Sequence, residues 1–189
     1  MKYWLDTEFI ENGSTIDLIS IGIVAEDGRE LYAQRDTANF KAGSDWLWRN
    51  VYPSLQHFDF RMGGRSCKRD QMADTLRDVH EGRCSKYEEC AWYSDIRGLV
   101  RTFCDPEAHG KPEFWGYYAD YDWVALCQLF GTMVDLPKNW PMYCRDIKQL
   151  CDDKGNPPLP HPGKGEHNAL ADARWNKQTW EFLQVLPVL

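Results

Sequence analysis

The spacing of hydrophobic and polar residues changes along this chain, and its first part is typical of β-strands. Apolar runs over residues 2–9, 16–25 and 30–34 have the length and composition of strands. The second run is too continuously apolar for a strand that exposes one face to water. Residues 26–29 (Glu-Asp-Gly-Arg) have the chemistry of a hairpin turn. We therefore expect three consecutive strands that form an antiparallel meander.

The remainder of the chain alternates helical periodicity with short strand-like runs. Residues 113–119 and 142–144 are typical of strands, and residues 154–166, with four prolines and three glycines, indicate a loop. Strands first, and then strands alternating with helices, predict an α/β fold with a mixed sheet and helices on both faces. Apolar residues at helical spacing predict helices over about 46–53, 88–104, 122–130, 146–153 and 168–185.

Composition narrows the class of protein. At 189 residues the chain fits one domain, 1–189, with an insertion at about 60–89. Charged residues make up 27% of the chain and the mean hydropathy is -0.61. No apolar run is long enough to span a membrane, and the seven cysteines form no Cys-x-x-Cys pair, so we expect a cytoplasmic protein with reduced thiols. The net charge of -7 argues against a protein that holds nucleic acid by bulk electrostatics, although it leaves room for a nuclease whose carboxylates are neutralised by metals.

Two carboxylates interrupt the first strand. Asp6 and Glu8 are two residues apart, so on a strand they point to the same face. Two like charges beside buried side chains are costly unless something neutralises them, and a divalent cation with its preference for oxygen ligands does so. The alternative for this pair alone is an edge strand with two solvated acids.

Further acidic positions lie at the start of two predicted helices. Asp120 and Asp122 occupy a junction where a buried strand ends and a helix begins, the place where ligands bind in open α/β sheets. Aspartate is also a common helix N-cap, so we expect one of the two to cap and Asp122 to coordinate. His167 and Asp172 flank the start of the last helix. For an isolated residue, the alternative is a surface histidine beside a helix N-terminus.

Taken together, these motifs resemble the DEDDh family of 3′–5′ exonucleases, which has a ribonuclease H-like fold. The family carries Asp-x-Glu on its first strand, an aspartate that opens a central helix, and His-x-x-x-x-Asp near its end. The chain is most similar to the ribonuclease AS type of exoribonuclease, and the likeness covers essentially all of it. Two departures, the absence of Thr-Gly after Glu8 and the tyrosines before Asp122, separate it from proofreading subunits. The matching segments are Asp6-Thr7-Glu8-Phe9-Ile10-Glu11, Leu18-Ile19-Ser20-Ile21-Gly22, Tyr121-Asp122 with Val124-Ala125-Leu126, and His167-Asn168-Ala169-Leu170-Ala171-Asp172.

The resemblance implies a ribonuclease H-like mixed sheet and a two-metal site with Mg²⁺ or Mn²⁺. It implies that Asp6 bridges both ions, that Glu8 and Asp172 complete the first ion's site, and that Asp122 holds the second. It also implies that His167 is the general base. On one continuous helix His167 and Asp172 would be about 140° apart, so we expect the histidine in the lead-in to the helix.

Aromatic residues beside the carboxylates suggest substrate contacts. Phe9 and Tyr118 are candidates for stacking on the terminal base, although most aromatic residues of the chain are expected in the core. The basic run 61–69 is expected to be a solvated loop, with a phosphate track as the alternative.

The function implied is 3′–5′ hydrolysis of single-stranded nucleic acid, with RNA favoured over DNA and nucleoside 5′-monophosphates as products. Two alternatives are a 3′–5′ DNA exonuclease and a catalytically silent nucleic-acid-binding module on the same fold. A silent module would be expected to lack a carboxylate or the histidine, and all five are present. The ribonuclease AS likeness also suggests a homodimer.

Overall fold

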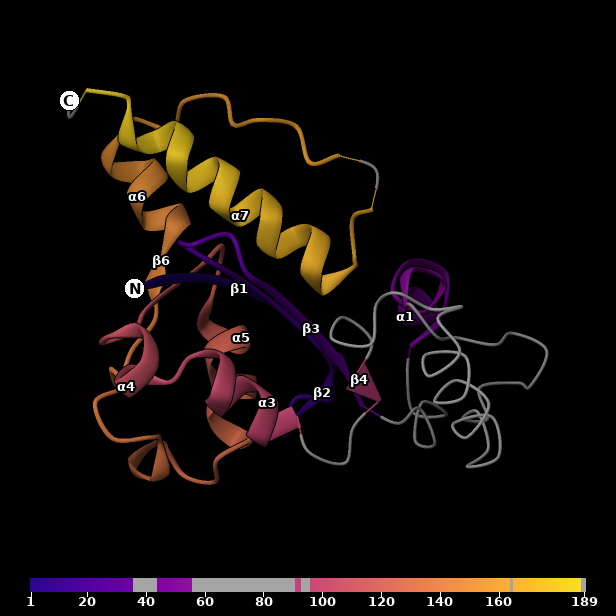
Figure 1. Ribbon diagram of the computed structural model, residues 1–189. Coiled ribbons are helices and arrows are strands. Elements are labelled where there is room, and N and C mark those ends of the chain that lie inside the picture. The colour runs from indigo at the N-terminus through magenta and orange to yellow at the C-terminus, as the bar shows by residue number, and fades with distance from the viewer. Residues whose placement is uncertain (36–43, 56–90, 93–95, 164, 188–189) are drawn as a thin grey trace, which may run out of the picture.

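The computed structural model describes residues 1–35, 44–55, 91–92, 96–163 and 165–187 (Figure 1). Its centre is a six-stranded mixed sheet in the order β4-β3-β2-β1-β5-β6. Strands β1, β2 and β3 form the predicted antiparallel meander, and β4, β5 and β6 each pair in parallel with a neighbour. The predicted α/β fold and its mixed sheet, an antiparallel meander followed by parallel strands, are therefore confirmed. The strands are β1 (Lys2–Glu11), β2 (Ile16–Ala25), β3 (Glu30–Gln34), β4 (Ala91–Trp92), β5 (Glu113–Gly116) and β6 (Arg145–Asp146).

Helices cover both faces of the sheet, as Figure 1 shows. On one face lie α6 (Ile147–Asp153) and α7 (Ala169–Gln184), which pack on Trp4 of β1. On the other face, the side chains of β1 and β2 form the largest core cluster with α3 (Ile96–Phe103) and α5 (Asp120–Gln128). Three shorter elements, α4 (Pro106–His109), η2 (Tyr52–Ser54) and η4 (Met133–Asp135), and the helix α1 (Asp45–Asn50) complete the described secondary structure.

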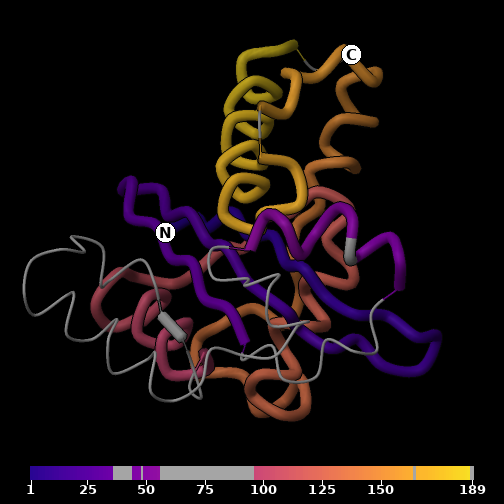
Figure 2. The backbone as a smooth tube through the Cα atoms, turned by 90° about the vertical axis from the view of Figure 1, so that its right-hand side faces the viewer, coloured from indigo at the N-terminus to yellow at the C-terminus, as the bar shows by residue number. Residues whose placement is uncertain are grey.

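The start of α7 lies beside both the sheet and the α1–η2 segment, as the view in Figure 2 shows. A β-bulge lies at this end of the sheet, because the register changes from Glu8 opposite Ser20 to Phe9 opposite Leu18. Ile19 is the extra residue of β2. Its side chain packs with a separate apolar cluster that anchors α1 and η2 to the sheet: Leu47, Val51, Tyr52 and Leu55.

Three expectations about element boundaries were wrong. The helix expected over 88–104 begins at Ile96, because residues 91–92 form β4 beside β3. The strand expected over 113–119 ends at Gly116, and a turn with Tyr118 at φ 55° follows it. The strand expected over 142–144 lies instead at residues 145–146, which pair with β5. The basic run 61–69 and the insertion at about 60–89 lie outside the described residues.

Two further expectations concern membranes and cysteines. In the described part of the chain, no helix has both the length and the apolar character that crossing a membrane requires. Four of the seven cysteines fall in the described residues, and all four are free thiols: Cys104, Cys127, Cys144 and Cys151.

Candidate active site

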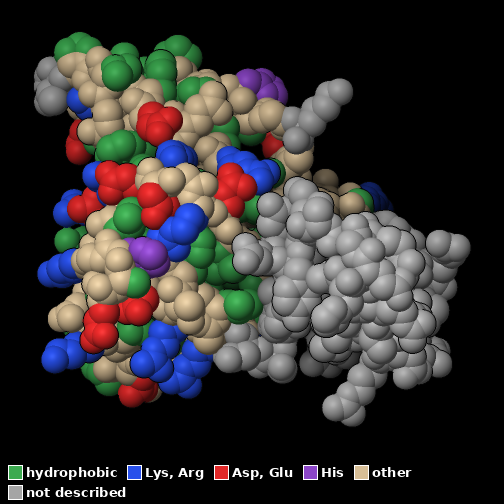
Figure 3. Space-filling view, viewed as in Figure 1, with side chains coloured by type: hydrophobic (Ala, Val, Ile, Leu, Met, Phe, Trp, Pro, Cys, Tyr) green, Lys and Arg blue, Asp and Glu red, His purple; other side chains and the backbone are tan. Residues whose placement is uncertain are grey.

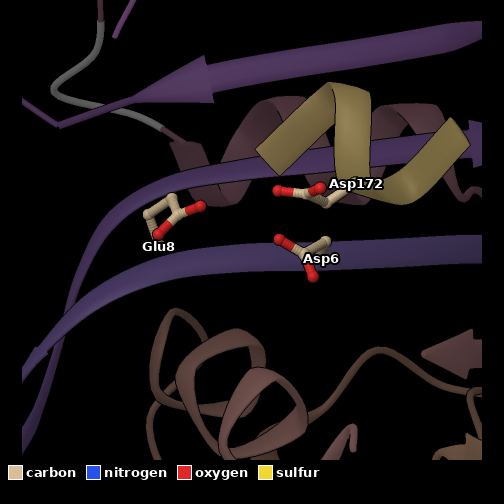
Figure 4. Close-up of side chains that lie close together, drawn as sticks. All are labelled: Asp6, Glu8 and Asp172. Atoms are coloured by element: carbon tan, nitrogen blue, oxygen red, sulfur yellow. The ribbon is translucent and has the colours of Figure 1, made fainter. Parts of the chain in front are cut away.

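Three carboxylates from the two ends of the chain converge on one point. Oxygen atoms of Asp6, Glu8 and Asp172 all lie within 4.8 Å of one another. Asp6 and Glu8 project from the same face of β1, as their spacing predicts, and Asp172 comes from the first turn of α7. Figure 4 shows the three side chains directed into the same space between the strand and the helix.

A glycine in β2 makes this convergence sterically feasible. Gly22 lies opposite Asp6 in the β1–β2 register. A Cβ atom at Gly22 would lie 2.2 Å from the carbonyl oxygen of Ala169 and 2.4 Å from the Cα of Leu170. Only glycine allows the backbone of α7 to approach the sheet this closely. The first turn of α7 is thereby seated next to Asp6, with Asp172 on it.

Asp122 reaches the same region from the other side of the sheet. Its Oδ1 accepts hydrogen bonds from the backbone N–H of Thr7 at 2.7 Å and from the Thr7 hydroxyl at 2.6 Å. This edge of β1 is accessible because β5 pairs with it only as far as Trp4. Asp122 is buried at the start of α5, and of the neighbouring charges it raises the pKa of Asp6 most.

Burial raises the pKa values of all four carboxylates, and repulsion by other members of the cluster raises those of Asp6 and Glu8 further. Burial, followed by the charges of Asp172 and Asp122, raises the pKa of Glu8 to about 8. Burial likewise raises the pKa of Asp6 well above its usual range. For Asp122, burial raises the pKa to about 6 although the hydrogen bonds from Thr7 lower it. Within the described ranges, no lysine or arginine forms an ion pair with any of these four groups. Four crowded oxygen donors, which pair with no lysine or arginine in the described part of the chain, are a donor set that fits hard divalent cations.

The expectation that one of the two junction aspartates caps α5 was wrong. The N-cap of α5 is Ala119, and Asp120 is exposed in the first turn with no capping hydrogen bond. Asp146 provides the carboxylate that the junction needs. Its carboxylate accepts hydrogen bonds from the backbone N–H groups of Tyr118 at 3.3 Å, Ala119 at 3.2 Å and Lys148 at 2.6 Å. It thereby caps α6 and holds the turn that leads into α5 and Asp122.

His167 lies outside α7, as the 140° argument predicts. The N-cap of α7 is Asn168, and His167 precedes it with a left-handed backbone, φ 66°. A hydrogen bond from the backbone of His167 lowers the pKa of Asp172, although burial raises it overall. The His167 ring lies edge-on to Trp46 of α1, with 4.9 Å between ring centroids. The histidine is therefore joined to the carboxylate cluster through its own main chain.

Two aromatic residues that adjoin the site carboxylates in the sequence contact each other. Phe9, the neighbour of Glu8, packs edge-on against Tyr121, the neighbour of Asp122, with centroids 5.8 Å apart. The Tyr121 side chain is half-exposed. Tyr118 is exposed and packs on Tyr117, whereas Phe9 packs on Tyr121.

Sequence reasoning missed four residues around this site. The sequence could have identified two of them: Tyr121 directly precedes Asp122 in a motif, and Asp146 is an aspartate at a predicted helix start, a common N-cap position. No sequence pattern marks Trp46 and Ser54, because they contact His167 and Asn168 only through the tertiary fold.

Comparisons with known proteins point to one kind of enzyme. The sequence model of the "3'-5' exoribonuclease Rv2179c-like domain" matches residues 1–184. Two curated proteins of Mycobacterium tuberculosis, "3'-5' exoribonuclease Rv2179c" of strain H37Rv and "3'-5' exoribonuclease MT2234.1" of strain CDC 1551, are each 36% identical over 176 residues. Each alignment covers 92% of this chain and 88% of the relative. A solved structure of S. pombe Pop2p in its Mg²⁺- and Mn²⁺-bound form has 12% identity and a TM-score of 0.44, over 97% of this chain and 82% of that one.

Proposed function

Since the chain belongs to the Rv2179c-like family of 3′–5′ exoribonucleases, we propose that it is a metal-dependent nuclease of the DEDDh type. It removes nucleoside 5′-monophosphates from the 3′ end of single-stranded RNA. One observation carries the proposal: the convergence of Asp6, Glu8 and Asp172 within 4.8 Å, with Asp122 held beside them by Thr7.

The carboxylates would hold two divalent cations, Mg²⁺ or Mn²⁺. Asp6, Glu8 and Asp172 would hold one ion, and Asp122 together with Asp6 would hold the other. When bound, such ions activate water and stabilise negative charge that develops at a phosphoryl group. The chain's own contribution is to keep four oxygen donors converged against their repulsion. Gly22 and Thr7 do this by fixing α7 and Asp122 relative to β1.

His167 accepts the proton of the attacking water in this mechanism. It does not lie on the helix that carries Asp172, so its imidazole can face substrate while its main chain bonds the Asp172 carboxylate. A positioned base of this kind raises the rate of the reaction about 10²- to 10⁴-fold.

Recognition of the terminal nucleotide falls to the aromatic side chains. Phe9, which is partly buried, and Tyr121, which is half-exposed, form a pair of rings suited to stacking on a base, and each directly adjoins a carboxylate of the cluster in the sequence, Glu8 or Asp122. Tyr118 offers a second, exposed ring at the same strand–helix junction. On the face in Figure 3, acidic and basic side chains are interspersed over the described residues.

Degradation of labelled oligonucleotides tests the proposal. A 5′-labelled single-stranded RNA should shorten stepwise from its 3′ end with Mg²⁺ or Mn²⁺ and stay intact with EDTA. The matched DNA should be degraded more slowly. A 3′-phosphate should block the reaction, because the carboxylates repel it. Internal cleavage of a circular RNA at a comparable rate would contradict the exonuclease assignment, and faster loss of the DNA would select the alternative of a DNA exonuclease. Binding of RNA without cleavage under any metal condition would select the silent module.

Two further properties are proposed from the same likeness. We expect a homodimer, which light scattering of the purified protein tests. We also expect a cytoplasmic location, where single-stranded RNA ends and free divalent cations are both present, and fractionation of the source cells tests this.

A further inference from the structure

The main chain around His167 is held by residues from a distant part of the sequence. The hydroxyl of Ser54, at the end of η2, lies within hydrogen-bond distance of two carbonyl oxygens, that of His167 and, at 2.7 Å, that of Val51, and can donate its one proton to either. In return, the Nδ2 of Asn168 donates to the carbonyl oxygen of Ser54 at 2.9 Å. Ser54 thus makes reciprocal bonds with two consecutive residues, His167 and Asn168.

The segment that carries Ser54 is itself fixed to the sheet. Residues 44–55, here called the support segment, begin with Ser44, whose hydroxyl accepts the N–H of Leu47 and caps α1. Their apolar side chains pack on Ile19, the bulge residue of β2. The next residue of β2, Ser20, lies opposite Glu8. A short path of contacts therefore joins the strand beside Glu8 to the backbone of His167.

The conformation of His167 requires such support. Its φ of 66° lies in the left-handed region, which side-chain-bearing residues adopt only when their surroundings favour it. The support segment contacts this residue twice, through the Ser54 bond to its carbonyl and through the edge-on contact between Trp46 and its ring. Both contacts act on the orientation of the imidazole.

We propose that the support segment positions the imidazole of His167, and that Ser54 is its positioning residue. This inference rests on the proposed function, in which His167 accepts the proton of the attacking water. Ser54 itself touches neither metal nor substrate in this scheme. It orients the imidazole of His167, which accepts the proton of the attacking water.

The two halves of the reciprocal pair can be removed separately. Ser54→Ala removes the hydroxyl that bonds the carbonyl oxygens of His167 and Val51 and keeps the carbonyl that Asn168 uses, whereas Ser54→Thr keeps a hydroxyl. Asn168 also caps α7, because its Oδ1 accepts the N–H of Ala171 at 3.1 Å. Asn168→Ser keeps an oxygen that can cap the helix and removes the Nδ2 donor. Ser14→Ala, in the exposed hairpin turn between β1 and β2, is a control for loss of a hydroxyl.

Steady-state kinetics on single-stranded RNA should separate positioning from binding. We expect Ser54→Ala to lower kcat about 10- to 100-fold, the effect of a misdirected catalytic group, with KM and the Mg²⁺ affinity unchanged. Ser54→Thr should restore most of kcat, Asn168→Ser should lower it in the same way, and Ser14→Ala should leave it unchanged. A Ser54→Ala variant with wild-type kcat, or with a loss confined to KM or Mg²⁺ affinity, would overturn the proposal.

A double-mutant cycle with His167→Ala gives the decisive comparison. This variant keeps the carbonyl that Ser54 bonds and removes only the imidazole. If Ser54 acts through the imidazole, Ser54→Ala should cost nothing further in the His167→Ala background. An equal additional loss there would show a general structural role and refute the inference.

An NMR measurement distinguishes failure of this inference from failure of the proposed function. The Hε1–Cε1 signal of His167 should be single in the metal-free wild type and broadened or doubled in Ser54→Ala. If His167→Ala retains full activity, the role of His167 as general base fails, whatever the NMR signal shows. If His167→Ala is impaired but the signal is unchanged by Ser54→Ala, the base assignment stands and the positioning role of Ser54 is refuted.

Discussion

Gly22 of β2 lies directly beneath the backbone of Ala169, so closely that a Cβ atom would be 2.2 Å from the Ala169 carbonyl oxygen. Asp6 is the cross-strand neighbour of Gly22, and Asp172 lies one helical turn beyond Ala169. The contact between a glycine and a helix N-terminus therefore sets the separation between carboxylates from opposite ends of the chain.

Gly22→Ala is expected to force α7 away from β2, because the atoms that clash are main-chain atoms. We expect a loss of about 1–3 kcal/mol or more in the free energy of unfolding, together with loss of most nuclease activity. Gly163→Ala is the matched control, because a Cβ at Gly163 meets nothing within 4 Å. Urea denaturation and the RNA assay measure both effects. A Gly22→Ala protein with normal stability and activity would show that α7 does not need this close approach.

Asp6→Asn should abolish tight binding of divalent cations, since it removes charge from the residue whose pKa the other three carboxylates all raise. We expect a rate loss of at least about 10³-fold, which corresponds to the loss of several kcal/mol of stabilisation of the transition state by the metal ions. Titration calorimetry with Mg²⁺ or Mn²⁺ measures the affinity. Asp17→Asn, at an exposed position of β2, is the control for removal of one acidic charge. Unaltered two-ion binding in Asp6→Asn would eliminate the proposed ligand set.

The metal-free protein should lose stability as pH rises from about 5 to 8. The pKa of Glu8 is about 8 in the folded chain, against 4.5 for an ordinary glutamate. Between these values the folded state keeps a proton that the unfolded state has lost, so stability falls with rising pH, in total by on the order of a few kcal/mol. Melting curves with EDTA should show this slope, and Mg²⁺ should reduce it. Glu8→Gln should reduce it, with the raised pKa values of Asp6 and Asp122 accounting for the remainder, whereas Glu181→Gln, exposed on α7, should leave it unchanged. A metal-free protein that becomes more stable over this range would contradict the raised pKa.

The two aspartates at the start of α5 should behave differently. Asp122→Ala removes the carboxylate that Thr7 holds next to Asp6, so we expect activity to disappear. Asp120→Ala changes an exposed side chain without a capping bond, so its effect on stability should stay within about 0.5 kcal/mol. The RNA assay and thermal denaturation measure the two effects. The reverse pattern of activities would identify Asp120 as the functional residue.

His167→Ala should lower kcat by about 10²–10⁴ while leaving Mg²⁺ affinity nearly intact, since His167 is proposed as a base and not as a ligand. His161→Ala, in the same loop and exposed, is the control. Single-turnover cleavage and calorimetry on the same samples separate the two roles. If Mg²⁺ affinity falls in parallel with kcat, the histidine is a ligand.

The periodic parts of the sequence predict the fold well. The β1–β2–β3 meander and α7 emerge from apolar spacing, and the position of Asp6 and Glu8 on one face follows from strand geometry alone. The placement of His167 before α7 follows in the same way from the 3.6-residue repeat. These features depend on local periodicity, which a single sequence displays directly.

The features that were not predicted depend on tertiary contacts. Strand β4 replaces part of an expected helix because residues 91–92 gain a pairing partner in β3. Asp146 replaces Asp120 as the cap at the α5 junction because β6 lies beside β5. The contacts of Ser54 and Trp46 with the His167 region likewise exist only after α1 packs on the bulge at Ile19. Neither residue carries a local pattern that distinguishes it from an ordinary surface position.

The placement of Asp6 on β1 and Asp172 on α7 has a consequence for folding. The set of ligands is incomplete until two segments far apart in the sequence have docked, and contacts of such large sequence separation form slowly because a long loop must close first. We expect the β1–β2–β3 meander to form before α7 seats on Gly22, so that tight binding of divalent cations is acquired late in refolding.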